Sequence, residues 1–508
     1  MNIIFILVDS FNKDVLRTYN PDSEVQCPNL EAFSSYATVF DNHFVGSLPC
    51  MPARREIMSG RKDFLWRPWG PMEVFDDRVA SHMAKGGYRT GIVTDHYHYW
   101  EEEANGYIED FESSTLVRGH ELDKHKLATE EKIPKWVEKM MEYRREGALQ
   151  YYANVRNFVG EEDYFPAKVF TEAAKWLDEY VGETPFYLHI ESFDVHEPFD
   201  VPEPYASQYL KEGDRAEELR KYYNIWPPYQ KYDDIFRFFE NTNQAELDFI
   251  RSQYKGNASM VDHWFGKLME KLDELELWND TVVIFTTDHG HDLGERGGFG
   301  KQYPHYDSHA NIPLMIWHPS YLGAGQRVTS LTQTVDLFAT LLDLAKLPCP
   351  ESAPHSRSVL PAMVNPNHEG REAIIYGTFG QGVCITDGEW TLFRSPTTEK
   401  SLYAYSSFIA RPLLVDNPVD GRVGRMPSRP SDQGYFDESI PYPLWQIPVK
   451  VDPRSQEHFL FNRKDDPEQK ENMWNDSPKE RDRLLRKLRD MMRYEGAPPE
   501  QFERLNLV

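Results

Sequence analysis

The sequence is poor in cysteine and contains no long apolar run. Its 508 residues include four cysteines, far apart at positions 27, 50, 349 and 384, which does not suggest a disulfide framework. No stretch approaches the roughly 20 apolar residues of a membrane span. The apolar run at 3–8 lacks the length and the basic flank of a signal peptide. We therefore expect a cytoplasmic protein with no membrane contact, although a secretion signal removed upstream of Met1 would leave the same pattern.

Basic residues are also scarce relative to acidic ones. The chain has 56 Lys and Arg against 82 Asp and Glu, a formal net charge of −26. Such a charge repels phosphate backbones, so nucleic acid is not an expected partner. A small-molecule anionic substrate would need a local cluster of Arg, Lys, His and metal that overcomes the net field.

What the sequence does contain is a regular alternation of apolar runs and helical patterns. Continuous apolar runs, typical of strands buried on both faces, lie at 2–8, 89–94, 186–190, 282–286 and 314–317. Helical patterns precede the second, third and fourth of them, at 76–85, 167–180 and 262–276. This alternation predicts an α/β fold with a large, mostly parallel sheet and helices on both faces.

The pattern of the sequence changes after about residue 365 from alternating strands and helices to short strands, which predicts two domains. Residues 1–370 would form the catalytic domain, with a charged helical insertion at about 118–165 and a long loop with short helices at 200–245. Residues 371–508 would form a smaller α+β domain with a short antiparallel sheet. Its expected elements are strands at 373–376, 382–386, 390–393 and 458–462 and a charged helix at 477–494. The insertion and the Pro-rich loops could serve as interface arms in a homo-oligomer.

The most specific local pattern is Cys-x-Pro-x-Arg, formed by Cys50, Pro52 and Arg54. It opens a predicted helix in which Pro52 suits the first position, since its missing N–H costs nothing there. Gly60 suits the helix stop. The positive end of the helix dipole and the guanidinium both favour negative charge on the Cys50 side chain, or on a group that replaces it.

Polar side chains follow directly on several predicted strands. Ligands of open α/β sheets bind beyond the carboxyl ends of the strands. The groups at these ends are Asp9, Thr94-Asp95-His96, Asp194-Val195-His196 and Asp288-His289-Gly290. Two carboxylates and an imidazole, joined by residue 50, can enclose one divalent cation.

In combination these motifs resemble the sulfatase family of the alkaline phosphatase superfamily. The resemblance is carried by Asp9, by Cys-x-Pro-x-Arg about 40 residues later, and by Asp-His-Gly at 288–290, with support from Gly298–Lys301 and Ile312-Pro313-Leu314. It covers residues 1–345 apart from the insertion, and the C-terminal part more weakly. It implies an alkaline phosphatase-like fold and hydrolysis of a sulfate ester. It also implies that a formylglycine-generating enzyme converts Cys50 to formylglycine, whose hydrate is the nucleophile.

The resemblance also implies roles for individual residues. The expected ligands of one divalent metal are Asp9, Cys50, Asp288 and His289. The expected catalytic residues besides Cys50 are Arg54, His196 and Lys301, and the expected substrate contacts are Thr94 and His96. Arg54 would hold the oxygens of the nucleophile, Lys301 those of the sulfate, and a protonated His196 would relieve charge on the leaving oxygen.

Three positions depart from the family pattern. Ser10 stands where many sulfatases have a second acidic residue, Thr94 replaces a lysine, and His289 follows the metal-binding Asp288 where an asparagine is common. Fewer carboxylates and one imidazole make the site less ideal for Ca²⁺ and more accommodating of Mn²⁺, so the expected ion is Ca²⁺ or Mn²⁺. These departures bring the sequence closer to phosphonate monoester hydrolases, so hydrolysis of phosphonate monoesters or phosphodiesters is the alternative function.

Two further alternatives keep Cys50 unmodified: a non-catalytic binding protein on the same scaffold, and a thiol hydrolase that uses Cys50 with His196. The sequence does not identify the alcohol part of the substrate.

Overall fold

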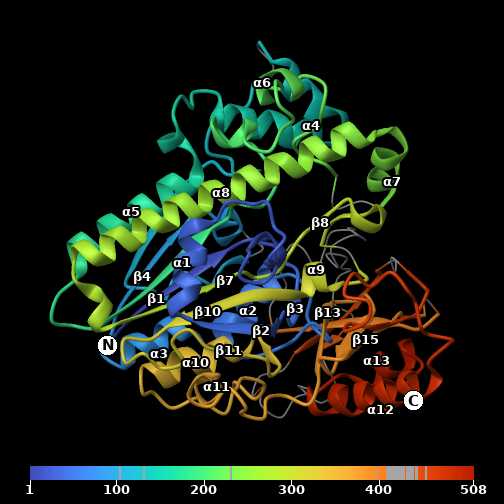
Figure 1. The fold of residues 1–508 in the computed structure, drawn as a ribbon. Helices are drawn as coiled ribbons and strands as arrows, with labels where there is room; N and C mark the ends of the chain where they lie inside the picture. Colours follow the sequence, from blue (N-terminus) through green and yellow to red (C-terminus); the bar gives the residue numbers. More distant parts are fainter. Residues whose placement is uncertain are drawn as a thin grey trace.

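The computed structural model describes residues 1–101, 104–129, 132–228, 232–301, 303–397, 399–407, 429–430, 440, 444–451 and 455–508. Within them the predicted α/β architecture is confirmed (Figure 1). A nine-stranded sheet forms the centre, and the smaller sheets of the C-terminal part lie at one end of it.

The main sheet is built around β1 (Asn2–Val8). This strand pairs in parallel with β6 (Phe186–Ser192) on one side and with β7 (Thr281–Thr286) on the other. Beyond β6 the sheet continues in parallel through β4 (Arg89–Thr94) and β5 (Ser113–Leu116). The carboxyl ends of the neighbouring strands β4, β6, β1 and β7 therefore meet at one edge of the sheet.

The other half of the sheet contains its antiparallel strand. β10 (Asn311–Trp317) runs antiparallel to both β7 and β2 (Thr38–Phe44). The chain reaches β10 through short elements, β8 (Asp292–Leu293), β9 (Phe299–Gly300) and α9 (Asp307–Ala310), and not through a crossover helix of the kind that parallel neighbours need. β11 (Arg327–Val328) and β12 (Thr332–Gln333) pair with β2 in parallel.

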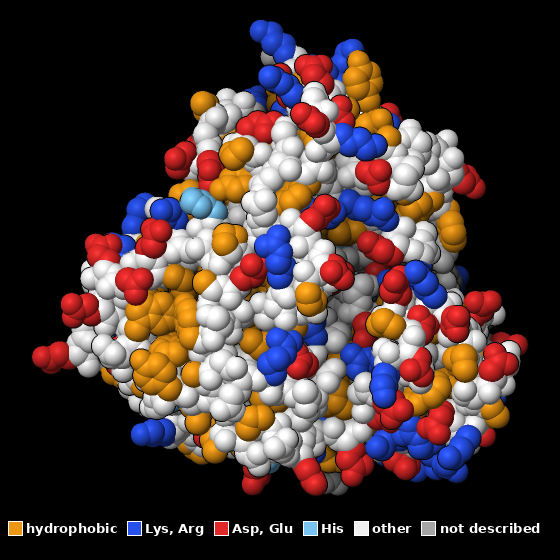
Figure 2. All heavy atoms as spheres, in the orientation of Figure 1, with side chains coloured by type: hydrophobic (Ala, Val, Ile, Leu, Met, Phe, Trp, Pro, Cys, Tyr) orange, Lys and Arg blue, Asp and Glu red, His pale blue; other side chains and the backbone are white. Residues whose placement is uncertain are grey.

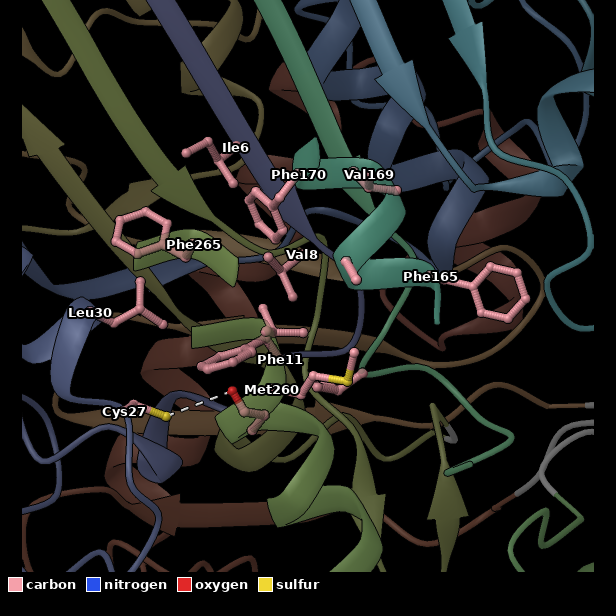
Figure 3. Packing of buried hydrophobic residues seen from close by; sticks show 14 of the residues in the cluster. Ile6, Val8, Phe11, Cys27, Leu30, Phe165, Val169, Phe170, Met260 and Phe265 are labelled. Atoms are coloured by element: carbon pink, nitrogen blue, oxygen red, sulfur yellow. Dashed lines mark hydrogen bonds between the residues drawn. The ribbon is translucent and has the colours of Figure 1, made fainter. Parts of the chain in front are cut away.

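Alternate residues of β1 enter the two cores on opposite faces of the sheet. Ile4, Ile6 and Val8 pack in the core covered by α1 (Pro28–Tyr36), α5 (Phe165–Tyr180) and α8 (Gln244–Glu274). Figure 3 shows Ile6 and Val8 among side chains from these helices. Ile3, Phe5 and Leu7 pack in the opposite core, under α2 (Cys50–Ser59), α3 (Val79–Lys85) and α10 (Asp336–Leu344). Both faces of the sheet are therefore covered.

Helix α8 is longer than the predicted 262–276. It begins after Asn243, whose side chain accepts a hydrogen bond from the backbone N–H of Glu246, and it spans the molecule in Figure 1. The charged insertion contains α4 (Lys135–Val155), which is kinked at Arg144. The 200–245 segment contains short helices as predicted, α6 (Ala216–Leu219) and α7 (Tyr232–Asn241).

The C-terminal part forms a five-stranded sheet that includes one strand from the N-terminal part. Its strands are β13 (Ile374–Thr378), β14 (Val383–Thr386), β15 (Trp390–Arg394), β19 (Phe459–Asn462) and β3 (Ser47–Leu48). The pairs from β13 to β19 are antiparallel, as predicted, whereas β3 joins β13 in parallel. The domain boundary at residue 370 remains a prediction.

Three helices and a second small sheet accompany the five-stranded sheet. Helices α12 (Pro478–Tyr494) and α13 (Pro499–Arg504) pack on the five-stranded sheet and its surroundings, and a smaller helix, α11 (Leu360–Val364), precedes β13. A second small sheet joins β16 (Leu402–Ser406), β17 (Arg429–Pro430) and β18 (Trp445–Val449).

The surface carries charges of both signs. Figure 2 shows acidic and basic side chains interspersed over the face in view. Among the helices of the described residues, none is both long and apolar enough to cross a membrane.

We predict that Gly60→Ala destabilises the protein more than Gly87→Ala. Both glycines have positive φ, +69° and +87°, so each substitution strains the backbone. A Cβ at Gly60, which ends α2, would also lie 2.6 Å from Cβ of Ala353, whereas one at Gly87 meets no atom within 4 Å. We expect an additional loss of about 1–3 kcal/mol at Gly60 from overpacking. Urea midpoints of the two variants measure it, and equal midpoints would contradict this packing.

Candidate metal centre and active site

Helix α2 begins at Cys50 itself. The sequence suggested that Pro52 is the first helical residue, but it is the third. Its missing N–H still costs nothing, because the first N–H groups of a helix have no intrahelical partner. Gly60 ends the helix in the left-handed conformation, and its N–H donates to the carbonyl of Glu56 at 2.8 Å. The helix thus places Cys50 and Arg54, one turn apart, at the carboxyl edge of the main sheet.

The structure brings the four predicted metal ligands together. Asp9 follows β1 directly, and Asp288 and His289 follow β7 after one intervening residue. One ligand atom from each of Asp9, Cys50, Asp288 and His289 lies within 4.8 Å of the others, and all four residues are buried. Their roles as ligands remain predictions, but their geometry fits a single ion.

His289 is oriented for ligation through Nε2. Its Nδ1 lies 3.0 Å from the carbonyl oxygen of Gly290, so Nδ1–H donates there and Nε2 keeps its lone pair. Burial lowers the pKa of His289 to about 3, which keeps the imidazole neutral. Nε2 lies 3.2 Å from Sγ of Cys50 and 3.2 Å from Oδ2 of Asp288. A neutral imidazole and two carboxylates suit a divalent cation.

Arg54 holds the carboxylates in place. Its Nη2 lies 3.0 Å from Oδ2 of Asp9, its Nη1 lies 2.6 Å from Oδ2 of Asp288, and its Nε lies 3.4 Å from Oε2 of Glu191. Nη1 also donates to the carbonyl of Cys50 at 3.2 Å. All these side chains are excluded from solvent, so the interactions are little screened.

Ser10 explains how the site tolerates the loss of a second acidic residue. Its hydroxyl donates to Oδ1 of Asp9 at 2.6 Å, and its backbone N–H donates to Oδ1 of Asp288 at 3.2 Å. Ser10 therefore fixes Oδ1 of each carboxylate, while Oδ2 of each carboxylate faces Arg54.

The environment of the Cys50 thiol differs from the sequence expectation. Burial, followed by the nearby Asp9 carboxylate, raises the pKa of this thiol well above its ordinary value, although Lys301 and Arg54 act in the opposite direction. The helix dipole and the guanidinium therefore do not produce a thiolate here. The unmodified sulfur is a neutral thiol and a weak nucleophile.

Lys301 and His196 lie on the same side of the cluster and share a counter-charge. Nζ of Lys301 is 3.6 Å from Oε2 of Glu197, and Nδ1 of His196 donates to the carbonyl of Glu197 at 2.8 Å. Burial lowers the pKa of Lys301, but Glu197, Cys50 and Asp9 raise it more, so the lysine stays charged. Burial and Lys301 together hold the pKa of His196 well below its usual range. The resemblance implied a protonated His196. Without a bound anion, however, this low pKa keeps the imidazole neutral.

Thr94 and His96 lie next to Arg54 and contact protein groups. The Thr94 hydroxyl donates to Oε2 of Glu191 at 3.3 Å and accepts from the N–H of His96 at 2.9 Å. Nε2 of His96 lies 3.2 Å from Sδ of Met51. Their predicted contacts with substrate remain predictions.

Sequence reasoning missed two buried glutamates, Glu191 and Glu197. Oε1 of Glu191 accepts from the hydroxyl of Tyr99 at 2.6 Å and lies 2.9 Å from Nε2 of His189. Oε1 of Glu197 lies 2.8 Å from Nε2 of His291. Their only sequence signal is position, since Glu191 continues the apolar strand β6 and Glu197 follows His196.

The central sheet and the residues at its carboxyl edge define an α/β protein with a candidate metal centre. The profile of the sulfatase family matches residues 1–347, and the chain belongs to this family. It is therefore a sulfuric ester hydrolase by class, which confirms the resemblance noted in the sequence.

Individual relatives are distant but cover most of the chain. An arylsulfatase of Clostridium perfringens (strain 13 / Type A) is 24% identical over 387 residues, 69% of this chain and 76% of that protein. A choline-sulfatase of Rhizobium meliloti (strain 1021) is 24% identical over 405 residues, 77% of each chain. The crystal structure of a phosphonate monoester hydrolase of Agrobacterium radiobacter has a TM-score of 0.66 at 19% identity, and the match covers 97% of this chain and 96% of that one. This structural likeness shows a shared fold.

We predict that Glu191→Gln weakens the acid sensitivity of the protein. Burial raises the pKa of Glu191, but Arg54, His189 and Tyr99 outweigh it and lower the pKa to about 2. A depressed folded pKa gives stability that is present above the ordinary pKa of 4.5 and is lost as the pH falls toward 2, in total roughly 3 kcal/mol. Thermal midpoints between pH 6 and pH 3 should fall less steeply in the variant than in the parent protein.

The matched control is Glu172→Gln, which removes an exposed pair with Lys175. It should leave the pH profile unchanged, because exposed ion pairs contribute little. Parallel profiles for Glu191→Gln and the parent would show that Glu191 is not held ionised as described.

Proposed function

We propose that this protein hydrolyses a sulfate ester through formylglycine derived from Cys50, at one divalent metal. The observation that carries the proposal is the convergence of Asp9, Cys50, Asp288 and His289 within 4.8 Å at the start of α2. The residues fit the metal, because their four ligand atoms converge and His289 presents a neutral Nε2. Ca²⁺ and Mn²⁺ both suit two carboxylates and one imidazole.

The two bound groups would supply distinct chemistry: the metal polarises a sulfuryl oxygen, and the aldehyde hydrate provides a hydroxyl for attack and a second for release. A thiol would form an adduct without such a release route. This favours the modified over the unmodified residue, in agreement with the neutral, buried Cys50 thiol.

The residues of the chain bind and orient the anion. Lys301 is a buried cation next to the cluster, and its partner Glu197 offsets its charge before substrate arrives. Arg54 binds both Asp9 and Asp288 and holds them in position next to each other. Both cations act in a water-poor site, where charge on sulfuryl oxygens is stabilised more than in bulk water.

His196 would become a proton donor only when an anion is bound. Its Nδ1–H is committed to the carbonyl of Glu197, and Lys301 disfavours a second proton. A sulfate group next to Lys301 would offset that positive charge and raise the pKa of His196. The role of acid toward the leaving oxygen thus depends on substrate binding.

Hydrolysis of phosphonate monoesters is the second candidate, favoured by Ser10. A hydroxyl in place of a second carboxylate makes the site less negative, and Ser10 donates to Asp9 instead of binding a cation. A phosphonate monoester, like a sulfate ester, carries one negative charge, so the same cations could hold either ester.

We predict that Cys50→Ala abolishes turnover and leaves the fold intact. The protein is co-produced with a formylglycine-generating enzyme, and the loss should be on the order of 10⁴-fold or more. Cys384→Ala, which alters a buried cysteine of β14, is the control and should keep activity. Hydrazine reagents should label the parent at residue 50, whereas iodoacetamide should not inactivate it. Substantial turnover by Cys50→Ala would refute the mechanism.

We predict that an aryl sulfate is hydrolysed faster than the matching aryl phosphonate monoester. The measurement compares kcat/KM for both esters with Ca²⁺ and with Mn²⁺. A preference for the phosphonate would promote the second candidate and identify Ser10 as its determinant. In that case Ser10→Asp should shift the ratio of the two rates toward sulfate.

A further inference from the structure

A second cluster of metal-ligating side chains lies beside the candidate active site. Asp95 follows β4, His120 follows β5, and Asp194 follows β6 after Phe193. One ligand atom from each of the three residues lies within 4.8 Å of the others, and all three residues are buried. None of them belongs to the set Asp9, Cys50, Asp288 and His289.

Each carboxylate of this cluster has one oxygen held by a donor. Oδ1 of Asp95 accepts from the N–H of Phe193 at 2.7 Å, and Oδ1 of Asp194 accepts from the side chain of Asn257 at 2.6 Å. Within the described part of the chain, Oδ2 of Asp95 has no hydrogen-bond partner, although Asp95 is fully buried. An unpaired buried carboxylate oxygen is costly. Donors that fix one oxygen are the usual means of orienting the other toward a metal.

The spacing between His120 and Asp194 also suits shared ligation. Nε2 of His120 lies 3.5 Å from Oδ2 of Asp194, which is long for a hydrogen bond. Two ligands at 2.0–2.1 Å on a tetrahedral ion are about 3.4 Å apart. Two carboxylates facing one imidazole also leave the cluster short of positive charge.

We propose that Asp95, His120 and Asp194 form a second divalent-metal site, of the Zn²⁺ or Mn²⁺ class. Two carboxylates and an imidazole, with a position left for water, are a ligand set that both ions accept. The competing arrangement is a protonated His120 held between the two carboxylates, since Asp194 raises the pKa of His120 against the effect of burial. Metal binding would displace that proton.

The second metal would have a positioning role. The N–H of Val195, next to Asp194, donates to the carbonyl of Asp9 at 3.1 Å. The ring of Phe193 stacks on His196 with centroids 4.3 Å apart. A metal on Asp194 therefore restrains the turn that carries His196 and supports Asp9, while the catalytic metal remains separate.

Metal counting on the full chain tests this proposal. Protein is saturated with Zn²⁺ or Mn²⁺, dialysed, and assayed by elemental analysis. We expect two equivalents in the parent, one in His120→Gln, and one in the double variant Asp288→Asn/His289→Ala. His43→Gln, a buried histidine bonded to Thr332, is the control and should keep both.

Combining His120→Gln with the double variant should remove the last equivalent. No metal in the double variant, or an unchanged count in His120→Gln, would overturn the second site and favour the protonated His120. If His120→Gln does not fold, the nearly isosteric Asp95→Asn replaces it. Zn²⁺ should then raise the thermal midpoint of the double variant Asp288→Asn/His289→Ala. It should not raise the midpoint of the same protein with Asp95→Asn added. Equal midpoint shifts would likewise overturn the proposal.

Discussion

One buried guanidinium holds the carboxyl edge of the sheet together. Arg54 contacts Asp9, Asp288 and Glu191, which lie at or just beyond the ends of three different strands, and it reaches them from one turn into α2. Three carboxylates in a solvent-free site would repel one another, and the loss of a single partner from such a network typically costs several kcal/mol. The positions of the candidate metal ligands therefore depend on Arg54 as much as on the strands.

The parts of the fold that the sequence revealed are those with a strong local pattern. The strand at 2–8 is apolar from Ile3 to Val8, so its burial on both faces could be predicted within a residue. The direction of β10 could not, because an apolar run carries no information about which way a strand runs. The first half of α8 was missed because several of its buried residues are polar, so its sequence lacks a clear helical period of apolar residues.

The same distinction applies to the site. Asp9, Cys50, Asp288 and His289 stand in short motifs next to strands or at a helix start, so their proximity followed from the topology. Glu191 was missed because its ionised state depends on partners far away in the sequence. The state of the Cys50 thiol depends on more than its local motif: the helix start and Arg54 favour an anion, as expected, but burial and Asp9 outweigh them.

The pairing of β3 with β13 has a consequence for the order of events during synthesis. β3 ends two residues before Cys50, and it pairs with β13, a strand that the ribosome makes much later. In the finished protein Cys50 is 4% exposed, so an enzyme could hardly reach its sulfur. An enzyme that modifies this side chain therefore has to act before β13 pairs with β3. The C-terminal sheet thus sets the last point in synthesis at which another protein could reach this side chain.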